Sequence, residues 1–132
     1  MKSHNLLFFL VELSFLSLLL IFSGTIHAQE ADGGYLPFAE KMPEPVGGIE
    51  AIYKKVIYPE DAKRTRLEGK VYVQVFVDES GSVSDVKVLK DIGMGCGNAV
   101  INAVKHVKYK PGQNKGVPVK VKLALAINFQ LK

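Results

Sequence analysis

The sequence predicts an α+β domain in which helices pack on one face of a three-stranded antiparallel sheet, preceded by an N-terminal signal or anchor segment. Apolar and polar residues alternate over residues 70–77 and 83–89, and again over residues 117–131, which predicts the strands. Apolar residues recur at helical spacing over residues 49–56 and 100–107, which predicts helices. With 132 residues, 48% of them hydrophobic and 23% charged, the chain has room for one folded domain and not for a multidomain enzyme.

The first 28 residues have the composition of a targeting segment. A basic start precedes an apolar stretch, Leu13–Phe22, that is interrupted only by serine, and the segment ends on alanine. This pattern predicts a secretory signal peptide that is cleaved before Gln29. A membrane anchor is the alternative, because Leu6–Phe22 gives 17 residues, the lower limit for crossing a bilayer, although Glu12 within it would be costly in lipid.

Residues 29–46 are predicted to form an extended linker. They contain three prolines and two glycines and show no apolar period. At the spacing of a polyproline helix, these 18 residues span at most roughly 56 Å. The folded domain is therefore expected over residues 47–132.

Two short helices are expected at the start of this domain. Ile49, Ile52, Tyr53 and Val56 share one face of a helix of two to three turns. Pro59 and the two carboxylates that follow it suit the first turn of a second helix, which should end before Gly69.

The middle of the domain reads as a β-hairpin followed by a helix. Four valines alternate with other residues over residues 70–77, a turn with glycine follows at residues 78–81, and the alternation resumes over residues 83–89. A glycine-rich connection then leads to a helix, with Gly97 or Asn98 as its N-cap and Val100, Ala103, Val104 and Val107 on its buried side.

The chain ends with its clearest pattern. Every odd-numbered residue from Val117 to Leu131 is apolar, whereas the even-numbered positions carry lysine, alanine, asparagine, glutamine and one proline. A period of two over this length predicts one long, half-buried terminal strand.

Candidate catalytic groups are few after residue 28. His106 lies among lysines at a predicted helix end, where it complements the helix dipole, and a zinc site would lack its third and fourth ligands. Cys96 has no second cysteine to pair with and no residue that would orient it toward His106. The net charge of +4 comes from scattered residues rather than a basic run, which argues against nucleic acid. We therefore expect no enzyme, cofactor or metal site.

The terminal strand is the informative feature, because an edge strand offers unpaired backbone groups to another chain. Lys120 and Lys122 could protect this edge against such pairing. The functional alternative is capture of an extended peptide as an added strand. The candidate partner-binding residues are Val119, Lys120, Val121, Lys122, Leu123, Ala124 and Leu125.

Residues 47–131 resemble the C-terminal domain of the TonB family, energy transducers that couple an inner-membrane motor to outer-membrane receptors. The resemblance rests on motifs in the expected order: Gly47-Gly48, Tyr58-Pro59, Gly69-Lys70-Val71-Tyr72-Val73, Gly81-Ser82-Val83, Tyr109-Lys110-Pro111-Gly112 and Ile127-Asn128-Phe129.

The resemblance implies that the last strand pairs with the TonB box, an extended segment near the N-terminus of a TonB-dependent receptor, and so supports active transport across the outer membrane. It implies a periplasmic domain, exported by the N-terminal signal or held at the inner membrane by an anchor. With an anchor, the ExbB–ExbD motor becomes a possible partner. Proline at Val121 or Leu123 is expected to abolish peptide binding.

Two function classes stay open at this point. The chain is either a TonB-type transducer, or a shortened relative, that binds receptors, or it is a soluble periplasmic module that binds or dimerises without coupling energy. A homodimer through the terminal strand is compatible with both.

Overall fold

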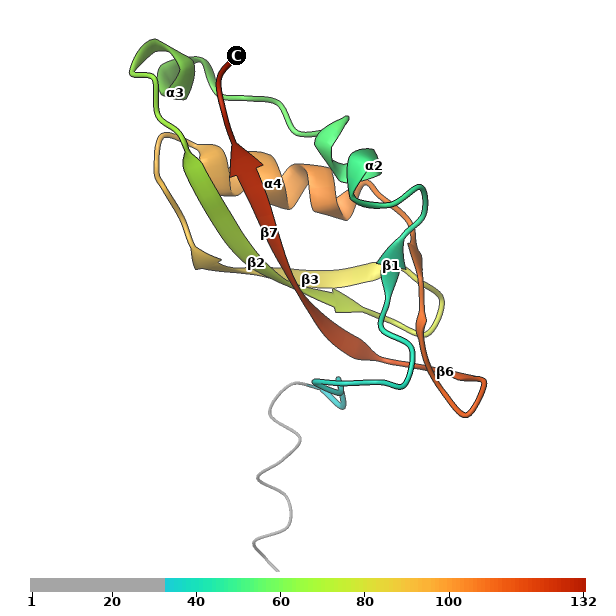
Figure 1. The fold of residues 1–132 in the computed structure, drawn as a ribbon. Coiled ribbons are helices and arrows are strands. Elements are labelled where there is room, and N and C mark those ends of the chain that lie inside the picture. Colours follow the sequence, from blue (N-terminus) through green and yellow to red (C-terminus); the bar gives the residue numbers. More distant parts are fainter. Residues whose placement is uncertain (1–32) are drawn as a thin grey trace, which may run out of the picture. The chain divides into compact units, whose positions relative to one another are not determined.

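The computed structural model describes residues 33–132 (Figure 1). The elements in chain order are β1 (Glu44–Pro45), α2 (Ile49–Tyr53), α3 (Glu60–Arg64), β2 (Gly69–Val77), β3 (Val83–Lys90), α4 (Cys96–Lys105), β4 (Tyr109–Lys110), β5 (Gly112–Asn114), β6 (Val117–Val119) and β7 (Val121–Phe129). The predicted signal peptide or anchor over residues 1–28 lies outside the described residues. Within residues 33–132, no helix is long and apolar enough to cross a membrane.

The main sheet has the predicted three antiparallel strands, in the order β3-β2-β7. The central strand β2 turns Val71, Val73, Val75 and Val77 into the core, where all four are fully buried. Val75 lies opposite Val86 of β3 and Leu123 of β7, so one apolar layer runs across the sheet. The predicted α+β fold and hairpin are confirmed.

Helix α4 packs against β2 and β3 and closes the core on that side (Figure 1). Its buried residues Val100, Ala103 and Val104 recur at the predicted helical spacing. The predicted N-cap, Gly97 or Asn98, was wrong, because the helix starts two to three residues earlier, after Gly95 in the left-handed conformation. Asp91 Oδ1 instead accepts the N–H groups of Gly93 and Gly97, at 3.0 and 3.1 Å, and so satisfies a helix donor from outside the helix.

The two helices before the sheet are short. α2 has five residues rather than the predicted two to three turns, and only Ile52 of its apolar face is fully buried, while Tyr53 is 38% exposed. α3 follows Pro59 and ends well before Gly69, as predicted.

The predicted single terminal strand is broken at Lys120. β6 pairs with β5, whereas β7 pairs with β2, so the two halves belong to different sheets. The β5–β6 hairpin turns at Lys115 and Gly116, which both have positive φ, 51° and 76°, as a type I′ turn requires. The apolar alternation continues across the break, although Val117 in β6 is 60% exposed.

We call residues 35–46, the part of the predicted linker that the structure describes within the domain, the arm. The arm lies along the domain at three places: Leu36 pairs with β7, Lys41 pairs with Gln113 of β5, and β1 pairs with β4. Residues from Tyr35 to Lys132 accordingly form one compact unit.

Candidate strand-addition site

The outer edge of β7 is the side that faces away from β2. Two hydrogen bonds identify which residues point there: the N–H of Lys122 donates to the carbonyl of Leu36 at 2.9 Å, and the N–H of Asn128 donates to Tyr53 Oη at 3.0 Å. Backbone groups of successive residues in an antiparallel strand point to opposite sides. The even-numbered residues of β7 therefore point outward, and the odd-numbered residues bond to β2.

Ala124 and Ala126 consequently present two N–H and two carbonyl groups on this edge. No hydrogen-bond partner for these four groups is found among the residues that the structure describes. We call the stretch Ala124–Ala126 the open window. Leu36 limits it at one end and Tyr53 limits it at the other.

The side chains around the open window leave room for another strand. Ala124 and Ala126 are small and exposed on one face of the sheet. On the other face Leu123 and Leu125 are only partly buried, since α4 lies over β2 and β3 rather than over β7. A strand added here would gain up to four backbone hydrogen bonds and would cover these two leucines.

The predicted binding residues separate into two groups. Val119 lies in β6 opposite Gly112, and the fully buried Val121 faces β2. Lys120 and Lys122 both bond through their backbone to Leu36.

Of the remaining predicted residues, Ala124 and Leu125 lie in the open window and Leu123 directly precedes it. Sequence reasoning left out Ala126, although the alternation over the terminal strand already included it. It also left out Leu36 and Tyr53, for which a local pattern gives no signal.

The side chain of Lys120 is occupied by contacts within the domain. Lys120 Nζ lies 5.5 Å from the centre of the Tyr35 ring. Its charge also contributes to the lowered pKa of Asp78, whose main cause is the hydrogen bond from the Ser80 hydroxyl. Lys120 thus faces the arm and the β2–β3 turn.

The register of β7 against β2 decides at which position a proline substitution tests partner binding rather than folding. The N–H groups of Val121 and Leu123 point toward β2, so proline at either position would break the central sheet itself. Ala124 is the position where proline removes only an outward donor, the arrangement in which edge strands tolerate it.

Cys96 and His106 lie at opposite ends of α4, roughly 15 Å apart at the rise of an α-helix. Cys96 is fully buried, and this burial raises the pKa of its thiol, with a further contribution from the nearby Asp91 carboxylate. His106 Nδ1 lies 2.6 Å from the carbonyl oxygen of Asn102, in the last turn of the same helix. The structure therefore does not bring the two side chains together.

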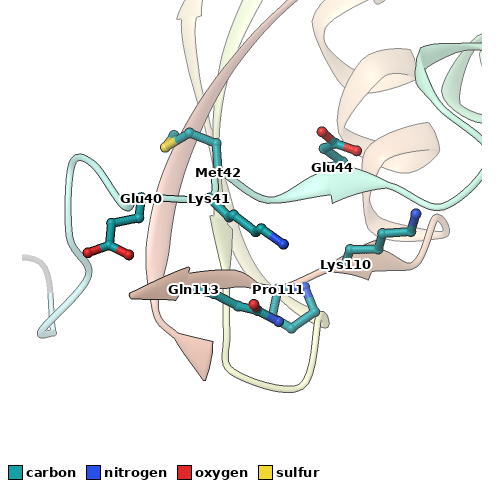
Figure 2. Close-up of a pocket in the computed structure, with 7 residues that line it drawn as sticks. All are labelled: Glu40, Lys41, Met42, Glu44, Lys110, Pro111 and Gln113. Atoms are coloured by element: carbon teal, nitrogen blue, oxygen red, sulfur yellow. The ribbon is translucent and has the colours of Figure 1, made fainter. Parts of the chain in front are cut away.

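A hollow of about 510 Å³ lies between the arm and the β4–β5 segment (Figure 2). Its lining includes two carboxylates, Glu40 and Glu44, and two ammonium groups, Lys41 and Lys110. This balance of charge favours neither an anion nor a cation.

Comparisons with known proteins identify a family and a set of similar solved structures. The family model of the Gram-negative bacterial TonB protein C-terminal region matches residues 54–131. Among solved structures, a Pseudomonas aeruginosa TonB C-terminal domain is 21% identical, covers 58% of this chain and 78% of its own, and gives a TM-score of 0.47. A Helicobacter pylori TonB C-terminal domain is 29% identical, covers 63% of this chain and 78% of its own, and gives a TM-score of 0.46. No curated protein matches the chain.

Proposed function

Because this chain belongs to the family of Gram-negative bacterial TonB C-terminal domains, we propose that it binds an extended segment of a TonB-dependent outer-membrane receptor by strand addition to β7. The observation that carries this proposal is the pair of outward, unpartnered residues Ala124 and Ala126 at the edge of the sheet. Backbone hydrogen bonds would supply most of the affinity, and the alternate side chains of the added strand would supply the specificity.

The opposite edge of the sheet is less suited to this role. In β3 the Asp85 carboxylate accepts the N–H of Val86 at 2.8 Å, and exposed Lys87 and Lys90 lie along the same strand. Charged residues on an edge strand discourage pairing with another chain. This difference favours β7 over β3 as the docking edge.

Membership of the family also supports a proposal for the wider role of the chain. We propose that receptor binding supports active transport across the outer membrane, that residues 29–132 function in the periplasm, and that no chemical reaction is catalysed. If residues 1–28 stay in the inner membrane as an anchor, the ExbB–ExbD motor would be the source of energy. If they are cleaved, the chain would act as a soluble binding module.

A pair of variants at Ala124 tests the binding mode in the full chain. The probe is a set of synthetic ten-residue peptides from the N-termini of TonB-dependent receptors of the same organism, titrated by calorimetry. Ala124→Pro should weaken binding by about tenfold or more, because one hydrogen bond is lost and the proline ring stands in the way of the added strand. Ala124→Val keeps the N–H and is the matched control, with unchanged affinity.

Circular dichroism must show that both variants are folded before their affinities are compared. Equal affinity of the proline and valine variants would contradict binding at this edge. N-terminal sequencing of the protein from separated membrane and periplasmic fractions tests the location: a start at Gln29 in the soluble fraction would exclude direct coupling to a motor in the membrane.

A further inference from the structure

The arm already adds one residue to the edge of β7 next to the open window. The N–H of Leu36 donates to the carbonyl of Lys120, and the carbonyl of Leu36 accepts the N–H of Lys122, both at 2.9 Å. Leu36 runs parallel to β7 at this point. The chain therefore makes, over one residue, the same kind of contact that the proposed partner would make over several.

Tyr35 holds the neighbouring Leu36 in place from the solvent face of the sheet. Its ring meets the Phe76 ring edge to face, with 5.2 Å between the ring centres, and its hydroxyl lies 2.6 Å from Ser84 Oγ. Phe76 is only 4% exposed, although Tyr72 on the same face of β2 is 39% exposed. The structure thus contains a slot, formed by Phe76, Ser84 and Lys120, that accepts an aromatic side chain.

The contact at Leu36 lies nearest the N-terminal end of the arm, ahead of the other two places where the arm is attached. Lys41 is bonded in both directions to Gln113, and β1 pairs with β4 over two residues. Leu36 contributes two hydrogen bonds, is itself 37% exposed, and is followed closely by Phe38, which is 78% exposed. Tyr35 and Leu36 can therefore leave β7 while the rest of the arm stays in place.

Resting on the proposed function, we infer that Tyr35 and Leu36 form a latch over one end of the receptor-binding edge. A partner strand longer than the open window displaces the latch and takes over its two hydrogen bonds at Lys120 and Lys122. It also places an aromatic side chain in the slot against Phe76. The complete docking edge then runs from Lys120 to Ala126.

The apparent affinity for a receptor peptide equals the affinity of the open edge multiplied by the fraction of molecules in which the latch is open. Three hydrogen bonds, two at Leu36 and one at the Tyr35 hydroxyl, and one aromatic contact are all partly solvated and are opposed by the entropy of ordering two residues. Together they would keep the latch closed in about nine molecules out of ten. Opening it should therefore tighten the binding of a ten-residue peptide by about tenfold.

Three variants of the full chain test this inference with the same receptor peptides. Tyr35→Ala empties the aromatic slot, and Leu36→Pro removes the N–H that donates to Lys120. Both should bind peptide about tenfold more tightly, and the Lys122 amide should exchange its hydrogen faster without peptide. Phe38→Ala changes an exposed residue of the same arm and should alter neither quantity. Unchanged or weaker binding by Tyr35→Ala and Leu36→Pro would overturn the latch.

A second probe separates failure of the latch from failure of the proposed function. If no receptor peptide binds to any variant, the proposed function fails. The latch is then tested with a synthetic peptide of residues 33–40 and the Tyr35→Ala/Leu36→Pro double variant. This peptide should shift the NMR signal of the Lys122 amide in the double variant and not in the unaltered chain. The absence of that difference would overturn the latch.

Discussion

Substituting Gly81 with alanine should destabilise the domain far more than the same change at Gly116. Both glycines lie in hairpin turns with a similar positive φ, +83° and +76°. A Cβ at Gly116 would meet no atom within 4 Å, whereas a Cβ at Gly81 would overlap the carbonyl oxygen of Tyr109 and lie 3.1 Å from its carbon. Comparing the two alanine variants therefore separates the stability lost to an unfavourable φ from the stability lost to steric overlap with Tyr109.

The magnitudes follow from these contacts. Replacing glycine by alanine at a left-handed φ lowers the free energy of unfolding by about 1 kcal/mol. This figure allows for the smaller conformational entropy of the unfolded chain that carries alanine. At Gly81 the overlap also pushes Tyr109 away and breaks the hydrogen bond from its N–H to the Gly81 carbonyl, 3.0 Å in length, which adds about 1 kcal/mol. Displacement of β4 adds about another 1 kcal/mol. We expect a loss of about 3 kcal/mol for Gly81→Ala and about 1 kcal/mol for Gly116→Ala.

Urea unfolding followed by circular dichroism measures both losses, and a thermal melt should show midpoints lower by about 12 °C or more and about 4 °C, respectively. The slope of the urea transition should stay the same in both variants, so that the midpoints report stability alone. Equal losses, within about 0.5 kcal/mol, would refute the contact between the β2–β3 turn and β4.

Three further predictions concern single side chains. Tyr109→Phe should stabilise the domain by about 1 kcal/mol in urea unfolding, because the buried Tyr109 hydroxyl has no partner among the described residues; a loss of stability would show that it has one. Asp91→Ala should cost about 1 kcal/mol in the same assay, since it removes the acceptor for the Gly97 N–H at the start of α4, and unchanged stability would exclude this capping role. Ser80→Ala should raise the pKa of Asp78 toward its ordinary value of 3.8 in an NMR titration, and an unchanged pKa would contradict the assigned cause. Because the pKa of Asp78 is lowered in the folded chain, the stability that this carboxylate contributes is present above about pH 4 and is lost as the pH falls further.

The sequence predicted those parts of the fold that depend on local repetition. The valines of β2 and the apolar positions of α4 recur at periods of two and 3.6 residues, and both faces are buried as expected. The break at Lys120 escaped prediction because the alternation does not change there. Only the partner strand changes, from β5 to β2, and strand partners lie far apart along the chain.

The sequence indicated that the terminal strand offers an edge, but not how much of that edge is open. An exposed edge at the terminal strand follows from its pattern and position. The limits of that edge come from Leu36 and Tyr53, which lie 75 to 86 residues before the amide and carbonyl groups that they bind. Capping of α4 by Asp91, six residues before Gly97, is likewise a contact outside the helix that a search for a local N-cap residue does not find.

Amide hydrogen exchange with and without a receptor peptide tests the central claim most directly. In the free chain the amides of Ala124 and Ala126 should exchange fast, whereas those of Leu123 and Leu125, which bond to β2, should be protected. Addition of saturating peptide should protect Ala124 and Ala126 and leave the β3 edge unchanged. Peptide binding that leaves both alanine amides in fast exchange would contradict strand addition at β7.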